Sequence, residues 1–309
     1  MPLSQRPSRS WGVVLGAIVV SGASGREAPV LPARATDFWH SGVGRKSAAL
    51  RIANDADGVE SVGHHAHMPC VFCGSTEPLT KEHVVSAWIA SLFPDVLDAD
   101  HVRRFEELDG SQEERNQWSG PPFAWTVRDV CAECNNGWMA DLEGKPILTP
   151  LIKDQARPLS LPDMMVIATW ATKTVLVAGL ATPGERDTAS AETYGWFGEH
   201  RQPLPGGVVW VARYSGDGQW PFSLHQHGGS FETRDGTRYR NFHAILAIGY
   251  LVLAVFGHEI PGDPPISGSS SRRRLLIWPS TDPVHWPPAE SMTEAMLTAE
   301  SAELPDPAS

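Results

Sequence analysis

The chain has 309 residues, of which 41% are hydrophobic and 20% charged, and this composition excludes a disordered or fibrous protein. Its net charge of −11 argues against a general binder of nucleic acid, because contacts to phosphate groups depend on lysine and arginine. The 4 cysteines are too few for the disulfide framework of a small secreted protein. They occur as two CxxC pairs, which indicates metal binding in a reducing compartment, and we expect a cytoplasmic protein.

The N-terminal segment contains an apolar run at residues 11–20, behind two arginines, as signal peptides do. The run is too short to cross a bilayer as a helix. Residues 26–67 have no sustained hydrophobic periodicity, and Met68 stands just before the first cysteine. We therefore expect residues 1–67 to be a disordered leader or an extension upstream of a true start at Met68. A secretory signal and a plain flexible arm are the alternatives.

The two cysteine pairs have the spacing of a metal site. Cys70 and Cys73 belong to the sequence CVFC, and Gly74 follows at once, as in zinc knuckles where glycine lets the backbone turn under the ion. Cys131 and Cys134 form the second pair, far along the chain. We predict one tetrahedral zinc ion held by all four thiolates. The alternatives are two unrelated cysteine turns or a redox pair.

Between the pairs, residues 79–84 read LTKEHV, which fits a short strand or hairpin. Adjacent strand residues such as Glu82 and His83 point to opposite faces, unless a bulge or turn brings both to one side. Residues 86–92 have the spacing of a short helix, which Pro94 ends.

The second pair leads into another predicted helix. Asn135 follows Cys134 directly, and Trp138, Met139 and Leu142 recur at helical spacing. Asn135 stands where a helix N-cap is expected, because asparagine is among the best capping residues. Trp138 and Met139 are predicted to be core residues.

The order of these motifs, CxxCG, then EHV, then CxxCN before a helix, resembles the HNH nuclease family and its ββα-metal fold. The resemblance covers about residues 70–145. It implies two strands and a helix around one divalent ion, with a separate structural zinc in the two CxxC pairs.

The resemblance also implies roles for individual residues. His83 matches the general base that activates water, while Glu82 and Asn135 match ligands of a catalytic Mg²⁺ or Mn²⁺ ion. Thr126 stands where the family has its middle asparagine, so the orienting role of that amide is in doubt. The alternative, purely structural roles are a hydrogen-bonded histidine next to the zinc knuckle for His83 and a helix cap for Asn135.

The implied chemistry is coherent on physical grounds. Hydrolysis of a phosphodiester needs a base for water and positive charge for the phosphate and the leaving oxygen. A histidine can accept the proton near neutral pH. An ion held by oxygen ligands can supply the charge, whereas a zinc ion with four thiolates has no open position. Two metals with different roles are therefore expected.

Residues 159–290 are predicted to form a second domain. Residues 164–180 are apolar over a helical length, and Pro162 lies just before them. Lys173 and three threonines within this run favour a buried helix over a membrane span. Strands are predicted at 208–214, 222–226, 242–256 and 275–278, with glycine-rich turns between them. We expect an antiparallel sheet with a helix packed on it.

The whole chain is thus predicted to be α+β, with an HNH-like zinc-binding domain at 68–158, a C-terminal α+β domain at 159–290 and a disordered acidic tail at 291–309. The predicted function is divalent-metal-dependent cleavage of DNA, with the C-terminal domain binding substrate or a partner, and no membrane association is expected. The alternative is a non-catalytic zinc-binding module that mediates nucleic-acid or protein interaction. Thr126 favours that alternative, as do the 8 basic and 15 acidic side chains of residues 68–160. A secreted or membrane-anchored protein is a third possibility, which depends on residues 11–20 alone.

Overall fold

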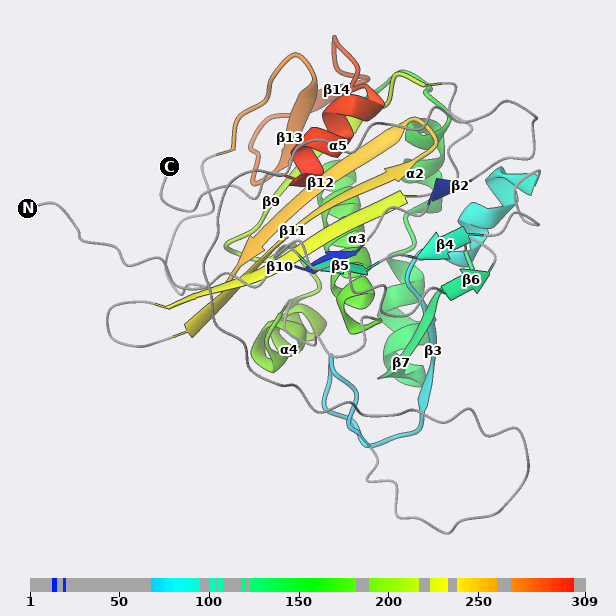
Figure 1. Cartoon of the computed structure of the whole chain (residues 1–309), viewed down its shortest axis with the longest axis vertical. Helices are drawn as coiled ribbons and strands as arrows, with labels where there is room; N and C mark the ends of the chain where they lie inside the picture. The colour runs from blue at the N-terminus through cyan, green and yellow to red at the C-terminus, as the bar shows by residue number, and fades with distance from the viewer. Residues whose placement is uncertain are drawn as a thin grey trace, which may run out of the picture. The chain divides into compact units, whose positions relative to one another are not determined.

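The computed structural model describes the parts of the chain that carry the predicted motifs (Figure 1). The described residues are 13–15, 19–20, 68–94, 101–103, 105–107, 118–120, 123–181, 189–216, 223–232, 238–259 and 268–302. All of them belong to one compact unit, which comprises residues 1–22 and 68–309.

A five-stranded antiparallel sheet forms the largest element, with the strand order β10-β11-β12-β9-β13. A single apolar run, residues 242–256, supplies most of two neighbouring strands, because Gly249 turns the chain with a φ of 57°. The strands are β9 (Val208–Arg213), β10 (Ser223–Glu232), β11 (Arg238–Ile248), β12 (Leu251–His258) and β13 (Arg274–Trp278). The predicted antiparallel sheet is therefore confirmed, as is the mixed helix-and-sheet class.

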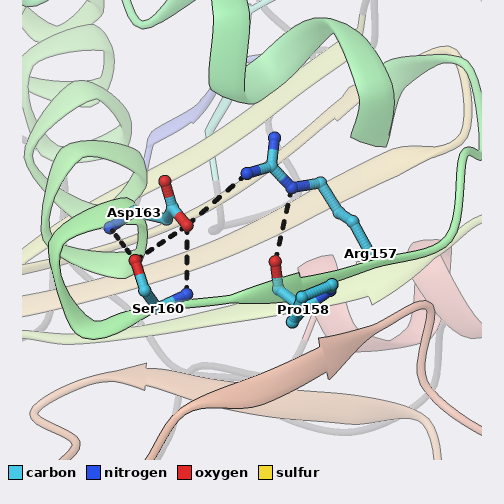
Figure 2. A network of polar contacts seen from close by, with 4 residues as sticks. All are labelled: Arg157, Pro158, Ser160 and Asp163. Atoms are coloured by element: carbon cyan, nitrogen blue, oxygen red, sulfur yellow. Dashed lines mark hydrogen bonds and ion pairs between the residues drawn. The ribbon is translucent and has the colours of Figure 1, made fainter.

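Helix α3 (Leu161–Leu180) packs against this sheet and is almost wholly buried (Figure 1). It begins three residues before its predicted start, with Pro162 inside the first turn, where no backbone N–H is needed for a helical hydrogen bond. Ser160 caps the helix in a reciprocal pair with Asp163 (Figure 2): the Asp163 N–H donates to Ser160 Oγ at 3.3 Å, and the Ser160 N–H donates to Asp163 Oδ2 at 3.0 Å. The Arg157 guanidinium lies 3.5 Å from the same carboxylate oxygen. These contacts fix where α3 starts.

The length and composition of α3 also fit a membrane span. Among the described residues, it is the helix that is long and apolar enough to cross a membrane. However, 78% of its most apolar 18-residue stretch is buried inside the protein. The prediction of a buried helix is therefore confirmed.

The opposite face of the sheet is covered by α5 (Glu294–Ala302), which lies in front of the strands in Figure 1. Met292 and Leu297 are buried in a cluster with Ala212, Ala254 and their neighbours on the sheet. The prediction of a disordered tail from residue 291 is wrong for residues 291–302, because these apolar side chains find a partner surface on the sheet. Residues 303–309 lie outside the described residues.

The segment with the cysteines forms two strands and a helix. β3 (Leu79–His83) pairs antiparallel with β7 (Thr126–Cys131), and the chain continues directly into α1 (Ala132–Cys134) and the π-helical turn η3 (Asn135–Met139). After β3 the predicted helix is a short 3-10 helix, η1 (Ala87–Leu92), because so short a segment closes with i to i+3 bonds.

Shorter elements complete the unit. Strand β1 pairs with β5, β4 lies between β2 and β6, and β8 pairs with β14. They comprise β1 (Val13–Leu15), β2 (Val19–Val20), β4 (His101–Arg103), β5 (Phe105–Glu107), β6 (Trp118–Gly120), β8 (Arg157–Leu159), β14 (Val284–Trp286), α2 (Lys145–Ile152) and α4 (Ala191–His200).

Two predicted boundaries, the end of the leader and the division between the two domains, can be compared with the structure. The apolar run at residues 11–20 contains β1 and β2, which pair with β5 and β4. The remainder of residues 1–67 lies outside the described residues, and the disordered leader stays a prediction. The predicted division after residue 158 falls inside β8, and Trp138 and Trp170 from its two sides share one hydrophobic core. Separate folding of the two predicted domains stays a prediction.

Candidate metal centre and the His83 strand

The four cysteines converge on one point. Their sulfur atoms all lie within 4.8 Å of one another, and the Sγ atoms of Cys73 and Cys131 are 3.6 Å apart. A tetrahedral ion with bonds of about 2.3 Å to sulfur has sulfur–sulfur edges of about 3.8 Å. All four thiols are free, so no disulfide competes for the sulfurs. The described residues therefore contain a cluster that could hold one metal ion.

Local backbone geometry places the first pair. Gly74 has a φ of 69°, and its N–H donates to the Cys70 carbonyl oxygen at 2.8 Å, which closes the knuckle. A side chain at this position would meet no atom within 4 Å, so the glycine is required by conformation and not by space.

A β-bulge joins this knuckle to the strand that carries the second pair. Between the pairings Thr80↔Val130 and Glu82↔Val127, β7 contains one residue more than β3. The extra residue frees the Asp129 carbonyl oxygen, which accepts a hydrogen bond from the Val71 N–H at 3.1 Å. The bulge thus holds the knuckle beside Cys131.

The protein environment shifts the pKa values of the individual thiols in different directions. Burial raises the pKa of the Cys134 thiol well above its ordinary value. Burial also acts on Cys70, but the backbone N–H groups of Cys131, Cys73 and Phe72 outweigh it and hold the pKa of that thiol below its usual range. A bound cation would favour the thiolate form at all four positions.

An aromatic cluster attaches the knuckle to α4. Phe72, between the first two cysteines, is buried and meets Trp138 edge-on at a centroid distance of 5.7 Å. The rings of Tyr194 and Phe197 on α4 complete the cluster at 5.6 and 6.2 Å from Phe72. Trp138 is therefore a core residue, as predicted, and Met139 is buried as well.

This contact gives a first prediction. A methyl group at Gly198 of α4 would lie 2.2 Å from the Phe72 carbonyl oxygen, whereas one at Gly195 would meet nothing within 4 Å. We expect Gly198→Ala to lower the free energy of unfolding by about 1–3 kcal/mol, as overpacking does. The matched control Gly195→Ala should raise it by about 0.5–1 kcal/mol, because glycine weakens a helix interior. Urea unfolding curves measure both, and equal stability of the two variants would refute the close packing of α4 on the knuckle.

Asn135 lies one turn into the helix, and Cys131 occupies the N-cap position, so the predicted capping role is wrong. The Asn135 side-chain Nδ2 instead donates to Thr80 Oγ1 at 3.0 Å and to the Lys81 carbonyl oxygen at 2.8 Å. The amide therefore ties the helix to strand β3.

Glu82 points into the protein and meets a charge from the second half of the chain. Its Oε1 lies 2.7 Å from the Nζ of Lys173 on α3, and the two side chains are 8% and 3% exposed. Near this pair, Trp170 Nε1 donates to Ser86 Oγ at 3.2 Å. These two polar contacts attach the end of β3 to α3.

His83 is the last residue of β3 and is half-buried, directly opposite Thr126 in the strand register. The bulge lies further along the hairpin, so Glu82 and His83 keep the alternation of a strand and belong to opposite faces. Thr80, whose hydroxyl Asn135 contacts, and Glu82 are two positions apart on β3 and belong to one face. Among the described residues, no hydrogen bond or ion pair joins the side chains of Glu82, His83 and Asn135 to one another.

The sequence motifs missed Lys173 as a partner of this region. It is the one charged residue in the apolar run 164–180, and a charge in a buried helix requires a counter-charge. The lone lysine in the apolar run therefore predicts a counter-charge nearby, but it does not identify Glu82 as the residue that supplies it.

Comparisons of this chain with protein-family models, with curated proteins and with solved structures find no match.

Proposed function

We propose that Cys70, Cys73, Cys131 and Cys134 bind one structural Zn²⁺ ion. The sulfur geometry supports this role, and an all-thiolate tetrahedral donor set suits zinc better than hard cations such as Mg²⁺. Four protein ligands leave no open position for a substrate, so the ion would stabilise the fold and take no part in chemistry.

We propose further that the chain is an HNH-type endonuclease that hydrolyses phosphodiester bonds of DNA in a divalent-metal-dependent reaction. The observation that carries this proposal is the order β3, β7 and α1, with His83 ending the first strand and Asn135 in the helix after the second. This is the strand–strand–helix order of the ββα-metal resemblance, and the four cysteines link its parts.

In this proposal His83 is the general base. Its half-buried ring can accept a proton from a water molecule that attacks the phosphate. Thr126, its register partner, offers a hydroxyl group where an amide is expected, and it orients the ring less firmly than an asparagine would.

The residues that the resemblance assigns to a catalytic ion are Glu82 and Asn135, whose oxygen atoms would suit Mg²⁺ or Mn²⁺. In this structure they do not form such a site, because Glu82 is paired with Lys173 on the face of β3 opposite His83 and the Asn135 amide is bonded to Thr80 and Lys81. When bound, the ion supplies positive charge for the phosphate and the leaving oxygen.

A non-catalytic zinc-binding module that mediates nucleic-acid or protein interaction is the second candidate. The Glu82–Lys173 ion pair favours it, because a carboxylate that is buried and already paired is a poor ligand for a further cation. Thr126 and the acidic balance of residues 68–160 also favour it.

Incubation of supercoiled plasmid with the full-length protein and either EDTA, Mg²⁺ or Mn²⁺ separates the two candidates. The nuclease proposal predicts nicked or linear DNA with the divalent ions and none with EDTA. Failure to cleave double-stranded DNA, single-stranded DNA and RNA under all conditions, by protein that retains its zinc, would leave the non-catalytic module as the better proposal.

A further inference from the structure

The four-cysteine cluster is open to solvent at one of its sulfurs. Cys73 is exposed, whereas Cys70, Cys131 and Cys134 are buried. A cavity of about 1050 Å³ lies between the knuckle and α4, and the described residues that line it include both cysteines of the first pair. A small polar molecule can therefore reach the Cys73 sulfur from solvent without unfolding of the core.

A second sulfur lies next to that of Cys73, on the other side of the cluster. The Cys131 Sγ is 3.6 Å from the Cys73 Sγ, and Cys131 is fully buried at the end of β7. The sulfurs of a disulfide bond are about 2.05 Å apart, so the two must come closer before they can be joined. The movement falls to Cys73, because its turn lies at the surface while Cys131 is held in the β3–β7 pair.

We propose that Cys73 is an oxidation site for hydrogen peroxide, and that Cys131 is the resolving cysteine that closes a disulfide with it and releases the metal ion. The inference rests on the zinc ion of the proposed function. It does not depend on nuclease activity.

The oxidation proceeds in two steps. The Cys73 thiolate attacks one oxygen of the peroxide, the O–O bond breaks and hydroxide leaves, so that Cys73 becomes a sulfenic acid. The Cys131 thiolate then attacks the Cys73 sulfur, the S–O bond breaks, a second hydroxide leaves and the S–S bond forms. The two thiolates lose two electrons in total, and the peroxide gains them.

The zinc ion leaves because its ligands are consumed. Zinc is bound by thiolates, and after oxidation only two of the four remain, which leaves an incomplete tetrahedral site. The disulfide replaces the ion as the link between the knuckle and β7. The hydrogen bond from the Val71 N–H to the Asp129 carbonyl oxygen and the packing of Phe72 involve other groups, so they can stay in place. Oxidation is therefore expected to be reversible.

The first test uses full-length, zinc-loaded protein and hydrogen peroxide, with released zinc followed by a colorimetric chelator. All 4 cysteines of the chain belong to the cluster, so a loss of free thiols reports on the cluster alone. We expect release of about one zinc ion per chain while the free thiols fall from four to two. Dithiothreitol followed by Zn²⁺ should restore both.

Peptide mapping by mass spectrometry identifies the bond in the same sample. Lys81 and Arg128 place the two cysteine pairs on different tryptic peptides, so a bond between Cys73 and Cys131 joins two peptides, whereas a bond inside one CxxC pair does not. We expect the joined peptides, with the other two cysteines alkylated. A bond inside either pair, a bond through another cysteine, or overoxidation of Cys73 without a disulfide would overturn the assignment.

The matched control concerns the exposed thioether beside the knuckle. Met68 is 46% exposed and also lines the cavity, so peroxide can oxidise it as well. Met68→Leu keeps an apolar side chain and should release zinc at the rate of the wild type. Slower release from this variant would assign the effect to Met68 and refute the inference.

The outcomes separate this inference from the zinc proposal. Protein that is purified without zinc but still forms the Cys73–Cys131 bond would refute the zinc proposal and retain the two cysteine roles. Protein that contains zinc and keeps both its ion and four free thiols in peroxide would refute the oxidation site and retain the zinc.

Discussion

Cys73→Ser should abolish zinc binding and cause a large loss of stability, although the side chain is exposed. The serine hydroxyl replaces one of four thiolates and leaves an incomplete tetrahedral site. Structural zinc contributes on the order of 10 kcal/mol to the folding of small zinc domains, comparable with the whole stability of a typical domain. We expect the zinc content to fall from about one ion per chain to almost none, and the melting temperature to fall with it.

Because Cys73 is exposed, its replacement tests the effect of losing the metal without disturbing the packing of the core. Cys131→Ser should have the same effect, but Cys131 is fully buried, so its replacement also disturbs packing. Ala132→Ser, on the exposed residue next to Cys131, is the matched control and should retain both zinc and stability. If Cys131→Ser is unstable while Cys73→Ser melts like the wild type, the cysteines serve the core and the zinc proposal fails.

His83→Ala should lower Mg²⁺- or Mn²⁺-dependent cleavage of plasmid by about 10²–10⁴-fold, the usual effect of a lost general base. The zinc content and the melting temperature should stay unchanged, because the His83 side chain makes no hydrogen bond or ion pair within the described part of the chain and the residue is only half-buried. His285→Ala provides the control, since this histidine is exposed and lies on β14. Equal cleavage by wild type and His83→Ala would point to a contaminating nuclease or to another site.

Thr126→Asn tests the same site in the opposite direction. Thr126 lies directly across from His83, so an asparagine there could accept or donate a hydrogen bond near the imidazole ring. If His83 is the base but is poorly oriented, the substitution should raise the rate of cleavage. A fall in rate at unchanged zinc content would show that the threonine itself is required.

The sequence predicted the features that depend on short spacing. The four cysteines converge as predicted, because two CxxC turns each place a pair of sulfurs and one antiparallel strand pair brings the turns together. The helix after the second pair and the antiparallel sheet also follow from local periodicity and turn residues. The identity of Glu82 and Asn135 as ligands stays a prediction, since both side chains make contacts within the protein.

Contacts between distant segments were beyond prediction. Glu82 and Lys173 are 91 residues apart, and no local pattern relates a strand in one predicted domain to a helix in the next. The C-terminal helix was missed for a similar reason. Met292, Met296 and Leu297 are few in an acidic segment, and only the exposed apolar face of the completed sheet gives them a place to pack.

The strand pair and the sulfur cluster also close a loop in the chain. Cys73 and Cys131 are separated by 58 positions, and the segment between β3 and β7 leaves and returns at almost the same place. The entropy of closing a flexible loop grows only with the logarithm of its length, so that doubling the length costs about 0.6 kcal/mol. The segment also contains η1, β4, β5 and β6, so this low cost applies to changes of length between these elements, which leave the metal centre and the His83 strand in place. A tag or a small domain inserted between β3 and β7 would be held at both ends by the same four sulfur atoms.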